Sequence, residues 1–273
     1  MDIKEKLEKL HAGLFEMMKM FNAFCVEHGI RYYLDSGSIL GAARHNDFIP
    51  WDDDVDLTMR RADFEKLLTV KDLVPAPYRI VLPEEFSPYF FDFTVRVINT
   101  EYPLRAEKEA DVAYQNYQNR LCMDIFILDE APKGKFKDRM MTFRQKMIYG
   151  KAMRYRFDKK MHKHSFTDRV KIAVLSFLGA FTSLKKLHKK QEKNATRYRG
   201  KGGEYYCVMN YTMESVHKRF PKAYYEEVAM LPVRGELFPV PYRYDEWLTR
   251  MYGDWRTPPP ENQRISLHLT QEE

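Results

Sequence analysis

Four carboxylates are crowded into one short stretch of this chain. Asp52, Asp53 and Asp54 follow one another directly, and Asp56 comes two residues later. Like charges a few ångströms apart repel and raise one another's pKa, so we expect a metal ion to offset the charge of carboxylates placed among apolar residues. If Asp54 and Asp56 begin a strand, their side chains point to the same face and converge on one spot. The stretch therefore predicts a divalent-cation site.

A glycine-serine pair lies upstream of the carboxylates. Gly37 and Ser38 follow the apolar run 30–34 and open a helix-like segment at 39–44. Glycine permits a close approach of the backbone, and the N–H groups at a helix start favour anionic oxygens. A divalent ion that bridges phosphates takes one or two carboxylates from the protein and leaves its other positions to substrate and water. The pair and the carboxylates together predict a phosphate-binding turn beside a metal site.

A further carboxylate, Asp124, lies within the apolar run 121–128. An unpaired carboxylate is costly to bury, so Asp124 needs compensation. A metal shared with Asp54 and Asp56 is the favoured explanation, and a structural hydrogen bond or an ion pair with Arg120 is the alternative.

Other charged residues near these segments have simpler interpretations. Asp129 ends the run that contains Asp124 and is interpreted as a strand-end cap rather than a ligand.

Arg44 and His45 close the helix-like segment, where they could reach a substrate phosphate or complement the helix C-terminus. A calcium loop starting at Asp52 is disfavoured because Leu57 stands where the loop needs glycine. A solvated acidic turn is the usual explanation of a charge run, and here the glycine-serine pair argues against it.

Residues 33–45, followed by 48–56, resemble the LicD family of phosphotransferases, which is similar to the wider nucleotidyltransferase-fold superfamily. In that superfamily a Gly-Ser pair precedes an Asp-x-Asp strand, and a third acidic residue lies on a later strand. Residues 121–129 resemble that later strand, and the C-terminal block with Tyr252 to Trp255, Arg264 and His268 adds support. The resemblance implies a catalytic and metal-binding set and a substrate-binding set. The first set is Asp54, Asp56 and Asp124 with Mg²⁺ or Mn²⁺, and the second is Gly37, Ser38, Arg44, His45 and Arg264.

One departure concerns spacing. Fifteen residues separate Ser38 from Asp54, more than is usual in the superfamily. The resemblance therefore leaves open whether Asp52 and Asp53 bind metal.

The resemblance implies a metal-dependent transfer of a phosphorylated alcohol. The favoured case is phosphocholine, moved from CDP-choline to a hydroxyl of a glycan or lipid-linked glycan precursor of the cell surface, as in lipopolysaccharide or teichoic acid modification. One alternative is a nucleotidyltransferase that acts on a sugar phosphate or alcohol phosphate. The other is a non-catalytic basic protein that binds a membrane surface or nucleic acid. The presence of Asp54, Asp56 and Asp124 argues against this non-catalytic alternative. The basic run lacks evenly interleaved aromatic residues, so no nucleic-acid partner is expected.

Hydrophobic patterns predict an α+β fold, with a nucleotidyltransferase-like mixed sheet flanked by helices and a helical insertion. Helices are predicted at 3–28, 38–45, 62–70 and 244–251. Strands are predicted at 30–34, 54–59, 78–82, 91–98, 121–128 and 205–211, with loop and short strands at 221–243. The chain then divides into a nucleotidyltransferase-like core at 1–132, a basic helical insertion at 133–203 and the C-terminal part of the catalytic domain at 204–273.

Charge is concentrated in the insertion. The net charge is +6, and lysine and arginine are dense from residue 133 to residue 201. The apolar stretch 172–181 is too short to span a bilayer. It could lie in a membrane surface, or it could be a buried helix with a solvated basic neighbour. No signal-peptide pattern opens the chain, and its three cysteines suit neither a zinc site nor a disulfide framework. We therefore expect a cytoplasmic protein, with peripheral contact at the inner face of the cell membrane as an option.

Overall fold

A mixed sheet of seven strands forms the centre of the computed structural model, which describes residues 3–85, 92–156, 166–211, 213, 215–264 and 266. The strand order is β1-β2-β5-β4-β3, with β6 paired to the far end of β5 and β7 paired to β6. The strands β2 and β5 run parallel, and the other neighbours are antiparallel. The strands are β1 (Tyr33–Leu34), β2 (Asp56–Arg60), β3 (Tyr78–Val81), β4 (Val95–Pro103), β5 (Arg120–Glu130), β6 (Tyr205–Val208) and β7 (Phe220–Pro221).

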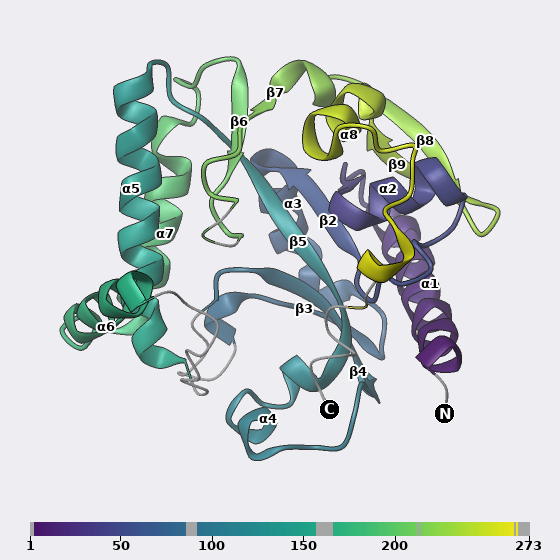
Figure 1. The fold of residues 1–273 in the computed structure, drawn as a ribbon, viewed down its shortest axis with the longest axis horizontal. Coiled ribbons are helices and arrows are strands. Elements are labelled where there is room, and N and C mark those ends of the chain that lie inside the picture. Colours follow the sequence, from purple (N-terminus) through teal and green to yellow (C-terminus); the bar gives the residue numbers. More distant parts are fainter. Residues whose placement is uncertain are drawn as a thin grey trace.

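Helices flank this sheet, as the sequence predicts (Figure 1). One group, α5 (Lys135–Ala152), α6 (Phe166–Gly179) and α7 (Leu184–Ala195), lies together to one side, at the left of Figure 1. This group confirms the helical character of 133–200 for the residues that the structure describes. The remaining helices are α1 (Ile3–Glu27), α2 (Ser36–His45), α3 (Arg61–Val70), the short α4 (Glu109–Ala113) and α8 (Tyr244–Tyr252).

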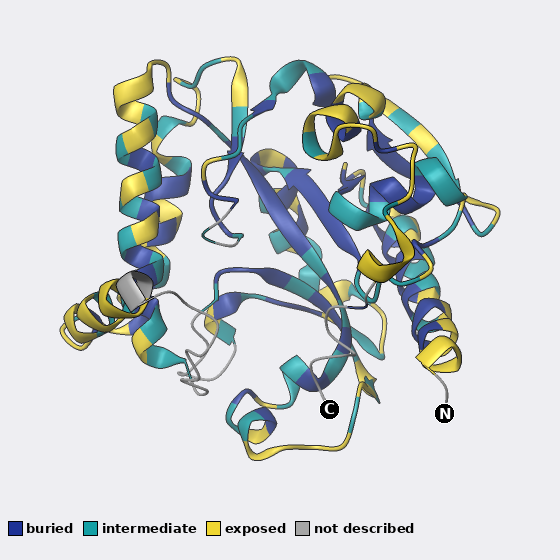
Figure 2. Ribbon diagram, in the orientation of Figure 1, coloured by how far each residue is buried: buried dark blue, intermediate teal, exposed yellow. Residues whose placement is uncertain are grey.

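The central strand β5 has two faces of different chemistry. Leu121, Met123 and Ile125 are at most 1% exposed and form part of the main core. Helix α1 covers this face with its apolar stripe, and Gly13 of α1 lies against Leu121. Asp124 alternates with these residues and therefore points to the other face. Figure 2 shows the strands as the most deeply buried part of the fold.

Some element boundaries differ from the predicted ones. Strand β1 has two residues rather than five, because its ladder with β2 contains only the pairs Tyr33 with Thr58 and Leu34 with Leu57. Strand β2 begins at Asp56 rather than at residue 54, and β4 runs from Val95 to Pro103. The predicted strand start at residue 91 lies outside the described residues.

The region predicted as loop with short strands contains a regular hairpin. Its strands are β8 (Val228–Val233) and β9 (Glu236–Pro241). The two turn residues, Arg234 and Gly235, both have positive φ, at 50° and 86°. This is the backbone combination of the tight turn that best matches the twist of a hairpin.

The interpretation of Asp129 as a strand-end cap is wrong. Asp129 is buried within β5, and its two carboxylate oxygens accept hydrogen bonds of 2.8 Å from Nε and Nη2 of Arg61 on α3. Arg61 also donates to Glu192 of α7 at 2.9 Å. One guanidinium therefore connects α3, the sheet and the basic insertion.

This ion pair leads to a stability prediction. Replacing Arg61→Leu leaves the Asp129 carboxylate buried without its partner, so we expect the free energy of unfolding to fall by about 3–5 kcal/mol. The double variant Arg61→Leu with Asp129→Leu removes both charges and should recover more than half of that loss. Urea denaturation followed by circular dichroism measures both changes. If the free energy of unfolding of Arg61→Leu lies within about 1 kcal/mol of the wild-type value, the ion pair does not matter for stability.

Candidate active site

Two of the predicted carboxylates lie side by side on one face of the sheet. Asp56 of β2 and Asp124 of β5 are direct partners in the parallel ladder, and Asp124 is also the partner of Arg96 on β4. Residues in register on neighbouring strands point to the same face, so these three side chains form a row across the sheet. Nε of Arg96 donates to Oδ1 of Asp124 at 2.8 Å. The alternative of an ion pair between Asp124 and Arg120 is wrong, because Nε of Arg120 donates to the carbonyl of Thr100.

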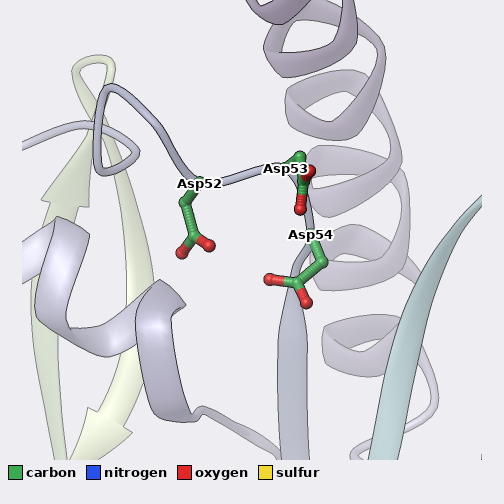
Figure 3. Close-up of side chains that lie close together, drawn as sticks. All are labelled: Asp52, Asp53 and Asp54. Atoms are coloured by element: carbon green, nitrogen blue, oxygen red, sulfur yellow. The ribbon is translucent and has the colours of Figure 1, made fainter. Parts of the chain in front are cut away.

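The other carboxylates lie on the loop between α2 and β2, residues 47–55, which we call the acidic loop. Each of Asp52, Asp53 and Asp54 offers a carboxylate oxygen within 4.8 Å of the other two (Figure 3). All three residues are half-buried. Of the predicted ligands only Asp54 belongs to this trio. Clustered carboxylate oxygens are the donors that Mg²⁺ and Ca²⁺ prefer, so the residues fit a hard divalent cation.

The N-terminus of α2 faces this loop. The helix begins at Ser36, so the glycine-serine pair lies inside its first turn rather than ahead of it. Asp35 caps the helix by accepting the backbone N–H of Ser36 at 2.7 Å. The hydroxyl of Ser38 accepts the backbone N–H of Asp56 at 2.9 Å, which joins the helix to the start of β2. Any side chain at Gly37 would overlap the carboxylate of Asp52, so glycine lets the acidic loop approach the positive end of the helix.

Residues far away in the sequence hold the acidic loop in place. Nε2 of His11 on α1 donates to the carbonyl of Asp52 at 2.7 Å, and the imidazole stacks on Phe48 with ring centres 4.5 Å apart. Burial lowers the pKa of His11, which favours the neutral ring. The hydroxyl of Ser266 donates to Oδ2 of Asp53. We did not predict His11 or Ser266 from the sequence; a single polar residue on the buried face of a helix was the only signal for His11.

Two of the predicted substrate-binding residues, Arg264 and His45, lie against Trp51 of the acidic loop, and Arg44 contacts His45. The guanidinium of Arg264 lies over the Trp51 ring, 5.2 Å from its centre, and the ring of His45 lies 6.2 Å away at a steep angle. Nε of Arg44 donates to His45 at 3.0 Å, and its Nη1 donates to the carbonyl of Trp255. Arg44 and His45 occupy the last turn of α2. They are therefore roughly 10 Å along the helix axis from the glycine-serine pair. His268 lies outside the described residues.

The electrostatics of the site are dominated by unfavourable negative charge. Burial raises the pKa of Asp56 well above its usual value, and the charges of Asp54 and Asp124 raise it further. Burial also raises the pKa of Asp35 to about 6, although the bonds from Ser36 oppose this. The pKa of Tyr211 is raised by burial and then by the charge of Asp56. A cation among these groups would relieve the repulsion.

The guanidinium of Arg96 supplies part of the compensation from within the protein. Burial by itself would lower the pKa of Arg96, but the charges of Asp124, Cys122 and Asp92 and the hydrogen bond to Asp124 together outweigh burial, and the pKa is raised. Arg96 also lies 3.8 Å from Asp92. We did not predict this residue from the sequence, because its role depends on the register between β4 and β5.

A mixed sheet with a helix N-terminus, an Asp-x-Asp segment and a third carboxylate on the neighbouring strand defines a nucleotidyltransferase-like enzyme. Residues 29–158 match the family described as LicD/FKTN/FKRP, nucleotidyltransferase domain. The chain is 26% identical over 255 residues to the lipopolysaccharide cholinephosphotransferase LicD of Haemophilus influenzae, an alignment that covers 93% of this chain and 92% of that protein. Residues 29–158 therefore form a LicD-family domain, and the chain is a phosphotransferase, as the sequence predicts; this argues against the non-catalytic alternative.

Two further relatives match over shorter segments. The human ribitol 5-phosphate transferase FKRP is 72% identical over 29 residues, 11% of this chain and 6% of that protein. An uncharacterized protein of Rickettsia typhi is 36% identical over 64 residues, 22% of this chain and 21% of that protein.

The raised pKa of Asp35 leads to a pH-dependent prediction. The folded protein holds this proton up to about pH 6, whereas the unfolded chain releases it near pH 4, so the wild type loses stability as the pH rises between these values. Asp35→Asn keeps a capping oxygen and carries no charge. In the absence of divalent cations we expect the variant to be more stable than the wild type by about 2–3 kcal/mol near pH 8 and equal to it below about pH 4.

Chemical denaturation in a chelating buffer at several pH values measures this difference. Acidic groups away from Asp35 titrate in both proteins and cancel in the comparison, whereas the charge of Asp35 also raises the pKa of Asp56. A stability difference that is the same at acidic and alkaline pH would contradict the assignment of a buried, destabilised carboxylate to Asp35.

Proposed function

We propose that this enzyme transfers phosphocholine or a closely related phosphorylated alcohol from a CDP-linked donor to a hydroxyl of a cell-surface glycan precursor, and that the reaction depends on a divalent metal. One combination carries the proposal: the carboxylates converge beside a helix N-terminus in a chain similar over 93% of its length to a lipopolysaccharide cholinephosphotransferase. The transferred alcohol and the acceptor rest on that similarity. The metal rests on the chemistry of the donor set.

The carboxylates divide into groups with different roles. Asp54, Asp56 and Asp124 would hold Mg²⁺ or Mn²⁺, which when bound neutralises charge that develops on the leaving nucleotide. Asp52 and Asp53 orient the acidic loop or bind metal-bound water. Asp124 would either complete the metal site or take the proton from the attacking hydroxyl, and its bond from Arg96 fixes the orientation of its carboxylate.

Backbone and cationic groups would bind the donor. The N–H groups in the first turn of α2, at Gly37 and Ser38, suit a diphosphate. The Ser38 hydroxyl accepts the N–H of Asp56, so its own hydrogen remains a donor for a phosphate oxygen. Arg44 and Arg264 provide positive charge at the other end of the helix, where they suit a second anionic group of the donor or acceptor. Burial and the charge of Arg44 lower the pKa of His45, so its neutral ring accepts from Arg44 and positions that guanidinium.

A second candidate reaction uses the same carboxylates. The description of the matching domain as a nucleotidyltransferase supports transfer of a nucleoside monophosphate to a sugar phosphate or alcohol phosphate. The two reactions differ in their products, because phosphocholine transfer from CDP-choline releases CMP and nucleotidyl transfer from CTP releases pyrophosphate.

The test of the proposal is an assay of released CMP. We expect the purified protein to release CMP from CDP-choline or CDP-ribitol in the presence of Mg²⁺ and a glycan acceptor, and to lose this activity in EDTA. Asp54→Asn and Asp56→Asn should each lower the rate at least about 100-fold, because each removes a ligand charge without changing shape. Without metal, the free energy of unfolding of each variant should stay within about 1 kcal/mol of the wild-type value, or rise because repulsion between the carboxylates is relieved.

Asp72→Asn is the matched control, because the Asp72 side chain is 90% exposed and contacts Lys71 rather than the site. Activity within tenfold of the wild type in both site variants would contradict the metal assignment. Pyrophosphate release from CTP without CMP release from any CDP-alcohol would replace the proposal with the second candidate.

Helix α6 supports peripheral contact with a membrane surface. Five large apolar side chains on it and just after it are 40–76% exposed: Val170, Val174, Phe177, Leu178 and Phe181. Their spacing places them on one face of a helix. The other face packs on α5, where Leu175 contacts Gly150. The exposed face argues against the alternative of a buried helix, and the lysines of α7 follow directly.

None of the described helices has both the length and the hydropathy to cross a bilayer. Contact through α6 would therefore be contact with the surface of the membrane. That arrangement would place the enzyme where a lipid-linked glycan acceptor is presented.

Membrane contact can be tested with matched phenylalanine variants. Phe177→Ser with Phe181→Ser should weaken binding to anionic vesicles at least about tenfold, because each inserted phenylalanine contributes about 1.5–3 kcal/mol. Phe136→Ser with Phe143→Ser is the control, since these α5 residues are 76% and 58% exposed. Vesicle sedimentation at low and high salt measures both. Equal loss in the two double variants, or a wild type that stays in the supernatant at both salt concentrations, would rule out contact through α6.

A further inference from the structure

A cavity of about 520 Å³ lies on the side of the sheet opposite the acidic site, and neither the family nor the proposed reaction assigns a use to it. Its apolar lining comes from α3, through Phe64 and Leu68, and from Val95 and Ile127 of the sheet. Val95 is the ladder partner of Ile125, and both alternate with the row that contains Asp124. These residues therefore point away from the carboxylates. A ligand in this cavity would not be in contact with the reacting groups.

The rim of the cavity on α7 is cationic. Lys185, Lys189 and Lys193 contribute to the lining at intervals of four residues, so they follow one side of the helix. Two carboxylates also contribute, from Glu84 and Glu192. Glu192 is already paired with Arg61 at 2.9 Å, so its charge is offset within the protein. An apolar floor with a net positive rim suits a ligand that has an apolar body and an anionic end.

His188 adds a polar group to the same wall. Its ring lies at a steep angle to Phe93, with centres 5.4 Å apart. Its Nε2 atom is buried and has no hydrogen-bond partner among the residues that the structure describes. Buried polar atoms are normally satisfied, so a hydrogen-bonding ligand at this wall would remove an unfavourable feature.

We propose that this cavity binds an amphiphile with one apolar chain and a phosphate head group. The chain lies against Phe64, Leu68 and Val95, and the lysines of α7 bind the phosphate. Helix α7 begins five residues after α6 ends, so the lysines of the rim follow the exposed apolar residues of α6 closely in the chain. The site is a lipid anchor separate from the donor site. It does not depend on which alcohol the enzyme transfers.

The chemistry of the ligand is shared by two sources, a membrane phospholipid and a lipid phosphate that carries a glycan. The first probe is dodecyl phosphate below its micelle concentration, titrated into the full-length protein by calorimetry without donor or metal. We expect saturable binding that is at least about tenfold tighter than that of octyl phosphate, dodecanol or dodecyltrimethylammonium, because the site uses both the chain and the phosphate charge.

Matched lysine variants distinguish this cavity from general attraction to a basic surface. Lys185→Gln with Lys189→Gln removes two charges from the rim, and Lys186→Gln with Lys190→Gln removes two charges from the same helix outside the cavity lining. The first pair should weaken dodecyl phosphate binding at least about tenfold, and the second by less than about twofold. Equal weakening by both pairs would overturn the proposal.

Two further measurements test the chain and the source. Leu68→Trp fills the floor of the cavity, so this variant should bind dodecyl phosphate no more tightly than octyl phosphate. Circular dichroism checks that the variant folds. The dependence of affinity on chain length in the wild type is a test that needs no variant. Tighter binding of farnesyl phosphate than of lysophosphatidylglycerol identifies a lipid phosphate carrier as the source, and the reverse identifies a phospholipid. No chain-length dependence in the wild type would refute the site.

Discussion

Repulsion between carboxylates is the constraint on which the rest of this structure depends. Asp56 is buried, and the charges of Asp54 and Asp124 add to the cost of ionising it. Arg96 on the neighbouring strand offsets part of this charge by binding Asp124. The acidic loop is kept in place against the repulsion by bonds from His11 and Ser266. Carboxylate oxygens gathered in this way suit a divalent cation.

The alternation of side chains along the sheet separates two kinds of chemistry. On β5, Asp124 points to the face that carries Asp56 and Arg96, whereas Ile125 and Ile127 point to the opposite face. The acidic face suits phosphate chemistry that a metal assists. The opposite face is covered by α1, α3 and α7, and it contains the apolar cavity with its basic rim. A ligand can therefore be bound on one face without entering the chemistry on the other.

Helices α5 and α7 are joined to the sheet by hydrogen bonds and an ion pair, although the neighbouring α6 is exposed. Arg61 connects α3, β5 and α7 through Asp129 and Glu192. Gln145 of α5 and Gln191 of α7 both donate to the carbonyl of Met209, in the segment after β6. Helix α6 packs on α5 with one face only and leaves its other apolar face exposed. A rigid attachment to the core and an exposed apolar helix are what a surface-binding element requires.

The sequence by itself determined the features that depend on local spacing. Helical and alternating patterns located most elements to within a few residues, and the contiguous glycine-serine and aspartate motifs identified the family, because each pattern lies within a few turns of chain. Even the arrival of Asp124 beside Asp56 followed from motifs carried by neighbouring strands.

Only the tertiary structure decided which groups compensate the carboxylates. Arg96 rather than Arg120 binds Asp124 because the register of β4 against β5 makes them partners. His11 reaches Asp52 across 41 residues of sequence, and Ser266 reaches Asp53 across 213. Asp129 was taken for a cap because its partner, Arg61, lies on a helix 68 residues away. Contacts at such separations leave no local periodicity, so they become visible only when packing brings the segments together.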